Sequence, residues 1–183
     1  MKNSKKLILI LLIIFILLSI LFFIFIKNTD ISIEEYTPQE EISESDIRKT
    51  IIYLYFKNIE TNSLIAEAKC IDAKDLFENP YEYIVNMLIY GPESDKLESA
   101  IPENTRVNSC KLVNDTVYVD FSKEFIDNAP TGKSEENLII ASIVNSLTEL
   151  NEVNSVKFLI NGEENLSFND KQISFENVFF RNN

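Results

Sequence analysis

The alternation of apolar and polar positions is most regular between residues 115 and 160, where it predicts a strand, a helix and a second strand. Residues 116–121 (TVYVDF) carry apolar side chains at every second position, as expected for a strand with one buried face. Residues 134–150 carry apolar side chains at helical spacing after two acids in the first turn. Residues 156–160 (VKFLI) alternate again, so we expect the helix to pack on the sheet and to share one core with it.

Similar patterns before and after this stretch predict the remaining elements. Residues 50–57 and 64–71 alternate as the two strands of a hairpin. A helix is expected between Asn79 and Gly91, because Asn is a favoured helix cap, a proline follows it, and glycine ends helices readily. Further strands are expected at residues 106–113 and 172–175.

The order of these elements predicts an α+β fold. We expect a two-layer sandwich, in which a mixed sheet of five to six strands carries two helices on one face and leaves its other face free. One transmembrane helix is expected to precede this domain.

An apolar segment near the N-terminus predicts that transmembrane helix. Residues 7–26 are all aliphatic or Phe except Ser19, and a helix of about twenty residues spans the roughly 30 Å hydrocarbon core of a bilayer. A cleaved signal peptide is the alternative, but its apolar region is usually only ~7 to 15 residues long and ends in a small-residue cleavage site. Three lysines precede the segment and one follows it, which favours a cytoplasmic N-terminus. We therefore expect residues 1–27 to form an uncleaved, single-pass signal anchor in the cell membrane, with the domain extracytoplasmic.

The next segment, residues 28–46, is acidic. It carries seven acids and no base, and such a segment favours an extended, solvated linker because like charges repel and little apolar surface can be buried. An acidic docking or cation-binding segment is the alternative. The folded domain is expected over residues 47–183. The chain has a net charge of −12, which excludes nucleic acid as a partner, since phosphate binding needs clustered Lys and Arg.

Five segments in a fixed order carry a resemblance to a known family. They are PYEYIVNMLIYGP, IPENTRVNSC, TVYVDFSKEF, SIVNSLTELNEVNSVKFLING and ISFENVFFRN. Together they resemble the GerMN domain, the family named for sporulation and spore germination, over nearly everything after Arg48. Residues 128–133 (NAPTGK) depart from the family, which usually has a Gly-Ser-rich loop there.

This resemblance implies a function. It implies a membrane-anchored extracytoplasmic binding or assembly module in a Gram-positive bacterium, acting in envelope assembly during sporulation or spore germination. Its partner would be an envelope or sporulation protein, and self-association, including ring-forming contacts, is one form that the assembly could take.

The residue inventory excludes most catalytic chemistry. The chain has no histidine, which removes Ser-His-Asp and Cys-His nucleophile pairs and every His-ligated zinc site. Two cysteines without a Cys-x-x-Cys motif and three glycines leave no thiol metal site and no glycine-rich phosphate loop. We therefore predict no catalytic residue, no metal and no cofactor.

Two other functions stay open as alternatives. The first is a peptidoglycan-acting enzyme that uses two carboxylates among Asp120, Asp127, Glu135 and Glu136, since glycan cleavage needs such a pair. Turn capping and the start of a helix already explain these positions, so we do not expect an enzyme. The second alternative is an extracytoplasmic sensor that binds a small ligand.

A row of side chains forms the candidate partner face. If the apolar row of residues 50–57 faces the helices, Ile51, Tyr53 and Tyr55 face away, and Tyr118 and Leu159 join them on the same side of one sheet. An apolar, aromatic patch on an open sheet face is typical of a partner surface, although tyrosines also fit exposed pleated surfaces.

Cys70 and Cys110 are both expected to point into the core. A disulfide between them would close a loop of about 41 residues and stabilise the fold by roughly 4 kcal/mol. Two separately buried thiols are the alternative, because the sequence does not place the Cα atoms within the ~7 Å that a disulfide needs.

Overall fold

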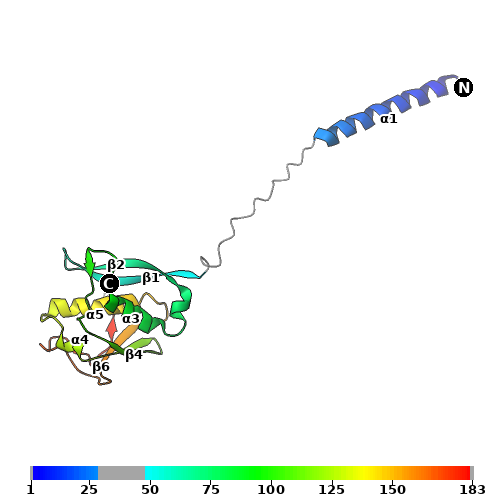
Figure 1. Ribbon diagram of the computed structural model, residues 1–183. Helices are drawn as coiled ribbons and strands as arrows, with labels where there is room; N and C mark the ends of the chain where they lie inside the picture. The colour runs from blue at the N-terminus through cyan, green and yellow to red at the C-terminus, as the bar shows by residue number, and fades with distance from the viewer. Residues whose placement is uncertain (1, 29–47, 182–183) are drawn as a thin grey trace. The chain divides into compact units, whose positions relative to one another are not determined.

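A computed structural model describes residues 2–28 and 48–181, and the chain divides into two units at Glu41 and Ile42, each described by itself. In the first unit, helix α1 (Lys2–Asn28) contains the predicted anchor (Figure 1). Its side chains are described only for residues 13–25 and 27, and within the described residues no helix is both long and apolar enough to cross a membrane. The anchor stays a prediction. The predicted acidic linker lies outside the described residues except for Asn28.

The second unit contains the remaining elements. In chain order these are β1 (Lys49–Asn58), β2 (Leu64–Asp72), the 3-10 helix η1 (Ala73–Leu76), α3 (Pro80–Tyr90), β3 (Leu97–Glu98), β4 (Val107–Val113), β5 (Thr116–Phe121), α4 (Glu124–Asp127), α5 (Lys133–Leu147), β6 (Ser155–Ile160) and β7 (Phe179–Phe180).

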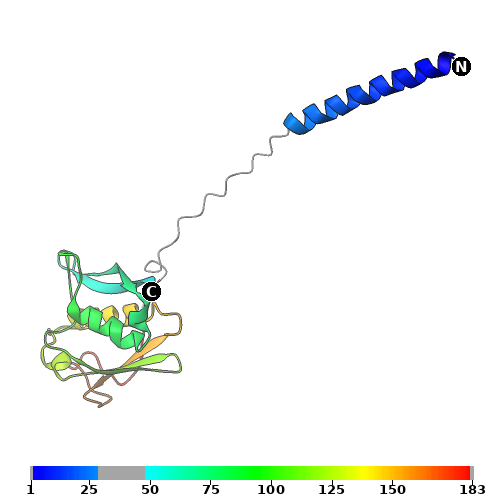
Figure 2. The same ribbon diagram turned by 45° about the vertical axis from the view of Figure 1, so that its right-hand side comes forward.

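The strands form two sheets with the helices between them. One sheet has the order β2-β1-β3 and the other β4-β5-β6-β7, in which only β5 and β6 run parallel. Figures 1 and 2 show α3 and α5 as a middle layer, with the β1–β2 hairpin on one side and the four-stranded sheet on the other. The domain therefore has three layers.

The α+β class is confirmed, but the single mixed sheet with two helices on one face is wrong. The physical reason lies at the edge of β1, where α5 takes the place of a neighbouring strand. The Tyr55 amide donates to Ser146 Oγ at 2.9 Å, and Ser142 Oγ donates to the Tyr55 carbonyl at 2.6 Å. Because serine hydroxyls satisfy these backbone groups, β1 has no need of a strand from the second sheet. Alternation identifies strands with one buried face, and it does not say which strands share a sheet.

The core lies between the layers. The apolar rows predicted for residues 116–121 and 156–160 are buried, as is the helical row of α5. Its densest part is a group of phenylalanines, in which the Phe121 and Phe125 rings stack with centroids 4.3 Å apart. The other members of this group are Phe158, Phe168, Phe175 and Phe179.

Local signals at the ends of elements were mostly correct. The Asn79 side chain caps α3 by accepting from the Glu82 amide at 3.2 Å, and α3 ends at Gly91 with φ +101°. The predicted strand at residues 172–175 is wrong. This segment folds back on residues 166–168, where the Phe175 amide donates to the Leu166 carbonyl at 2.8 Å, and β7 follows it.

Candidate functional site

The outer face of the β1–β2 hairpin is the first candidate surface. In the antiparallel register, Ile51 pairs with Cys70, Tyr53 with Ala68 and Tyr55 with Ala66, so these residues share the face turned away from the helices. Ile51 is 60% exposed and Tyr53 is 45% exposed. The small side chains of β2 leave both of them standing above a flat surface.

Tyr55 contributes its side chain to the fold and not to this open surface. Its hydroxyl donates to Glu149 Oε1 at 2.8 Å and accepts from Arg181, which also pairs with Glu149 at 2.7 Å. Burial and the Glu149 carboxylate raise the pKa of Tyr55 above its usual value. The cluster ties β1 to the end of α5 and to the C-terminal segment.

Tyr118 and Leu159 do not join Tyr53 and Tyr55. They lie half-buried on the outward face of β5 and β6, where Tyr118 pairs with Lys157 and Leu159 with Asp120. The helical layer separates this face from the outer face of the hairpin (Figure 2). The predicted partner face is therefore two faces on opposite sides of the domain.

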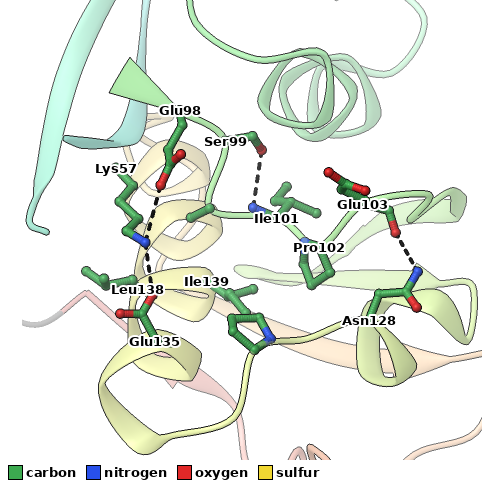
Figure 3. Close-up of a pocket in the computed structure, with 12 residues that line it drawn as sticks. Lys57, Glu98, Ser99, Ile101, Pro102, Glu103, Asn128, Glu135, Leu138 and Ile139 are labelled. Carbon is green, nitrogen blue, oxygen red and sulfur yellow. Dashed lines mark hydrogen bonds and ion pairs between the residues drawn. The ribbon is translucent and has the colours of Figure 1, made fainter. Parts of the chain in front are cut away.

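A cavity of about 230 Å³ lies at the other end of the hairpin, between β1, the N-terminal turn of α5 and the segment that follows β3 (Figure 3). Lys57 Nζ lies 3.0 Å from Glu135 Oε2 and 3.3 Å from Glu98 Oε1. The hydrogen bond with Glu135 raises the pKa of Lys57. Ile101, Ile139 and two prolines supply the apolar part of the lining.

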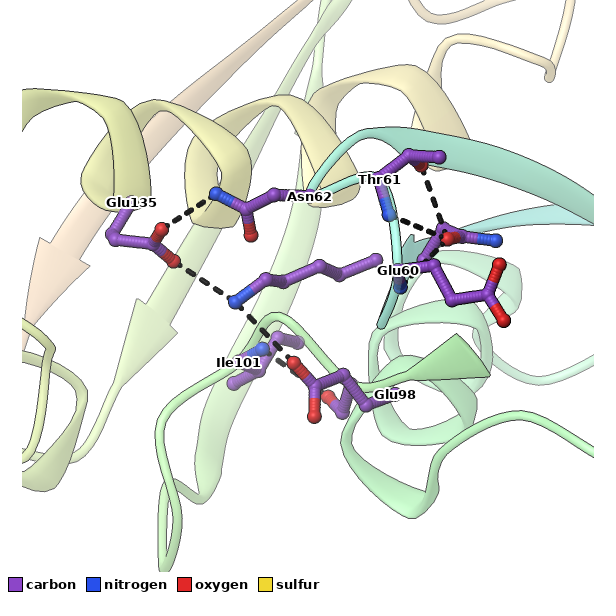
Figure 4. Close-up of polar contacts among 9 residues, drawn as sticks. Glu60, Thr61, Asn62, Glu98, Ile101 and Glu135 are labelled. Atoms are coloured by element: carbon purple, nitrogen blue, oxygen red, sulfur yellow. Dashed lines mark hydrogen bonds and ion pairs between the residues drawn. The ribbon is translucent and has the colours of Figure 1, made fainter. Parts of the chain in front are cut away.

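The hairpin turn closes one side of this ion-pair cluster (Figure 4). Asn58 Oδ1 accepts from the amides of Glu60 and Thr61, both at 2.9 Å, which fixes the turn. Asn62 Nδ2 then donates to Glu135 Oε1 at 2.8 Å. The hydrogen bonds from Asn62 and Lys57 lower the pKa of Glu135. The one lysine of the cavity lining is thus already neutralised, and the lining keeps an excess of carboxylate.

The carboxylates considered for catalysis are not brought together. Asp120 Oδ1 accepts from the Gly162 amide at 2.8 Å and fixes the turn after β6. Asp127 pairs with Lys123 at 3.3 Å, one helical turn away. Glu135 belongs to the Lys57 cluster, whereas its neighbour Glu136 interacts with Asp170.

Glu136 is the most perturbed acid in the described part of the chain. It is 1% exposed, and its Oε2 atom has no hydrogen-bond partner among the described residues. Burial and the neighbouring Asp170 raise the pKa of Glu136 to about 7. Hydrogen bonds, led by the Gln172 amide, lower the pKa of Asp170, whose Oδ2 also accepts from the Gly132 amide at 3.2 Å. A protonated Glu136 that donates to an ionised Asp170 accounts for both shifts.

Sequence reasoning missed this carboxyl pair. Glu136 and Asp170 lie 34 positions apart in the sequence, and Glu136 stands at an ordinary acidic helix start. Its burial depends on the C-terminal segment folding back over α5, which no local pattern predicts. Within residues 2–28 and 48–181, no group of three or more acids and cysteines is arranged to hold a metal ion.

The two cysteines do not form a disulfide. Both thiols are free: Cys110 is 3% exposed on the inner face of β4, whereas Cys70 is exposed on the outer face of β2. Burial raises the pKa of the Cys110 thiol to about 12. The inward position predicted for Cys70 is wrong, because Cys70 lies on the outer face and the inward row of β2 consists of Ile65, Glu67, Lys69 and Ile71. The loop after α3 satisfies the two charges of that row.

Comparison with known proteins gives one family match. Residues 53–166 match the family model Germane, described as sporulation and spore germination. A search of curated proteins gave no match.

Solved structures from two bacteria share this fold. The tandem GerMN domains of the sporulation protein GerM from Bacillus subtilis superpose with a TM-score of 0.61 at 21% identity, over 74% of this chain and 47% of that one. The first GerMN domain of the same protein gives 0.54 at 22% identity, over 66% and 89% of the two chains. A Clostridium perfringens protein described as a lipoprotein gives 0.51 at 19% identity, over 76% and 92%. The chain spans about half of the tandem GerMN structure, and identities this low show the fold alone.

Proposed function

The chain belongs to the Germane family of sporulation and spore germination domains, and from this premise we propose that it is an extracytoplasmic binding and assembly module. Its task is to hold a protein partner in the envelope of a sporulating or germinating Gram-positive cell. The N-terminal apolar helix anchors it in the cell membrane, with the N-terminus in the cytoplasm. The description of the C. perfringens relative as a lipoprotein supports an envelope location.

The outer face of the hairpin is the observation that carries this proposal. Ile51 and Tyr53 are exposed two positions apart on β1, opposite the small side chains of Cys70 and Ala68, and they border a cavity of about 180 Å³. A contiguous apolar patch with an aromatic anchor is typical of a protein interface. Tyr55 is held in the fold by Glu149 and Arg181, so the anchor residues of this surface are Ile51 and Tyr53.

Serine substitutions at Ile51 and Tyr53 test the surface. The matched control is Phe77→Ser with Val113→Ser, which removes a comparable exposed apolar area outside the hairpin. We expect the hairpin variant to lose partner capture by about 30-fold, since one buried aromatic anchor contributes about 2 kcal/mol. Heat-resistant spore counts and in-cell cross-linking measure the effect. Equal behaviour of the two variants contradicts the proposal.

We also propose that the module acts by contact and not by turnover. Asp120, Asp127 and Glu135 each have a partner that explains their position in the fold, and Glu136 is buried away from solvent. Asp120→Asn and Glu135→Gln are therefore expected to retain spore formation, because each amide keeps the shape and part of the hydrogen bonding. Loss of function in Asp120→Asn, without loss of folding, favours the peptidoglycan enzyme.

The cavity at Lys57 supports a second candidate function, the binding of a small ligand. Its volume is somewhat below the ~300 Å³ at which ligand pockets usually begin, and its excess of carboxylate suits a small cation. Lysine and cadaverine are suitable probes. Saturable stabilisation by either probe, abolished by Glu98→Gln, supports a sensor, and the absence of any shift excludes these amines as ligands.

A further inference from the structure

The open edge of β2 has a defined set of outward backbone groups. β2 is the outer strand of its sheet, and within residues 48–181 no strand pairs with its far side. The Tyr55 amide and carbonyl point from β1 towards α5, so the groups of the next residues, Leu54 and Phe56, point towards β2. It follows that Ala66, Ala68 and Cys70 turn their N–H and C=O groups outwards from β2. The side chains of all three are exposed.

We propose that this edge pairs antiparallel with β2 of a second copy of the chain, centred on Ala68. In this register Ala68 faces Ala68 of the second copy, and Ala66 faces Cys70. The twofold axis repeats the Ala66–Cys70 pair, so three pairs face each other across the edge. All three are of the hydrogen-bonded type, which gives about six backbone hydrogen bonds. Because Ala and Cys are small, the joined outer face stays flat.

The charges of β2 select this register. On its inner face, Glu67 of each copy lies opposite Lys69 of the other, at the ~4.5 to 5.5 Å separation of cross-strand neighbours. Moving the centre by one residue keeps the outward groups facing each other but places Glu67 against Glu67, or Lys69 against Lys69. Like charges directly opposite one another are destabilising, so the register centred on Ala68 is favoured.

Lys69 also limits which strands can use the edge. It points inwards, is 6% exposed, and its Nζ lies 3.6 Å from Glu93 Oε1. An inward charge on an edge strand normally blocks pairing with unrelated strands. A second β2 supplies an acid opposite this lysine, so the same residue that blocks other strands suits a second copy.

This inference rests on the proposed function in that it names a second copy as one partner of the assembly module. It concerns the edge of the hairpin, whereas the protein partner proposed above contacts its outer face. The two are read out separately, by cross-linking between copies and by spore counts.

Disulfide trapping in the full chain tests the register. In Ala66→Cys, the new thiol faces native Cys70 of the second copy at a Cα separation of about 5.5 Å, within disulfide range. Mild oxidation of membranes from expressing cells is expected to give a dimer on a non-reducing gel. The wild-type chain and Ala66→Cys/Cys70→Ser are matched controls, because their facing thiols are offset by four residues, about 13 Å. We expect no dimer from either control.

Charge variants in the Ala66→Cys background test the pairing of Glu67 with Lys69. Glu67→Lys alone and Lys69→Glu alone each place like charges across the edge and are expected to lose the dimer. Co-expression of the two variants restores opposite charges in the mixed pair, so the mixed dimer is expected to return. Intrachain contacts are the same in both experiments, and resistance to protease checks that each variant is folded.

The Ala66→Cys comparison decides the proposal by itself, because positions 66 and 70 are exposed. No dimer from Ala66→Cys, or equal dimer from all three chains, overturns it. A hairpin-face variant that still lowers spore counts would then leave the proposed function standing. A dimer in Ala66→Cys together with normal spore counts from the hairpin-face variant would support the pairing of β2 and contradict the proposed function of the hairpin face.

Discussion

The two sheets of the domain differ in how they are held. The four-stranded sheet is buried through its inner face, where Phe121 and Phe158 pack into a continuous group of aromatic rings. The three-stranded sheet buries the inner row of β1 and, from β2, Lys69 and Ile71, while Glu67 in the inner row of β2 is partly exposed. Serine hydroxyls of α5 attach its open side to the helical layer. More of the buried apolar side chains therefore come from the four-stranded sheet, whereas the three-stranded sheet exposes Ile51 and Tyr53.

The largest effect is expected in the aromatic group. Phe125→Ala removes a fully buried ring that stacks on Phe121, and such truncations cost about 3 to 5 kcal/mol of unfolding free energy. Tyr53→Ala, on the outer face of the hairpin, is expected to cost less than about 1 kcal/mol. Urea titration of residues 47–183 measures both. Equal losses of unfolding free energy in the two variants would mean that the two sheets contribute equally to stability.

The next effect depends on pH and comes from Glu136. Its pKa is raised from the ordinary 4.5 to about 7, so the folded state holds a proton that the unfolded chain releases between these values. The associated stability is fully present below pH 4.5 and is lost as pH rises through 7, by up to roughly 3 kcal/mol. Glu136→Gln keeps a donor towards Asp170 without a charge. It is expected to flatten this slope and to be more stable than wild type at pH 8.

Asp170 affects stability at the opposite end of the pH range. Because its pKa is lowered in the folded state, its contribution to stability is lost as pH falls through the acidic region. Urea titrations between pH 4 and 8 report the loss that comes from Glu136, because the ordinary pKa of Asp170, 3.8, lies below this range. A wild-type stability that is constant or rises from pH 4.5 to 7 would contradict the assignment to Glu136.

A smaller and more local effect is expected at the serines of α5. Ser142→Ala with Ser146→Ala leaves the Tyr55 amide and carbonyl without partners, at a cost of about 1 to 3 kcal/mol. Hydrogen exchange is expected to speed up in β1 and β2 and to change little in β5 and β6. Ser134→Ala, at an exposed position of the same helix, is the control. Uniform loosening of both sheets would show that they are not separately held.

The last prediction concerns the reactivity of the two cysteines and involves no change in stability. Thiol labelling compares them directly. In the native protein Cys70 is expected to react and Cys110 to stay protected, because Cys110 is buried and its pKa is raised to about 12. Denaturation without reductant is expected to expose two thiols per chain. One or no reactive thiol after denaturation would contradict the free state of the pair.

Much of the fold could be predicted from the sequence because its signals are local. Alternation identified the long strands β1, β2, β4, β5 and β6 but not the two-residue strands β3 and β7, and the Asn79 cap and Gly91 bounded α3. The arrangement of strands into two sheets could not be predicted. It depends on Ser142 and Ser146 replacing a strand beside β1, and in the sequence these serines look like ordinary helix positions.

The candidate surface was predicted only in part for the same reason. Tyr53 was correctly turned outwards, but Tyr118 belongs to the other sheet, and alternation along a strand carries no information on that difference. Cys70 was turned the wrong way because Ala and Cys look apolar, while the inward Lys69 is satisfied by a loop distant in sequence.

The two serines of α5 also limit the size of an assembly that pairs through the three-stranded sheet. A fibre grows only when each subunit offers two free edges, one to accept a neighbour and one to continue the sheet. Here α5 occupies the β1 side at Tyr55, so a subunit that pairs through β2 offers no second free edge at that position of the same sheet. A subunit that is paired through β2 therefore cannot add a further subunit through β1. If β2 pairs with a second copy as proposed, growth through this sheet ends at a closed twofold pair.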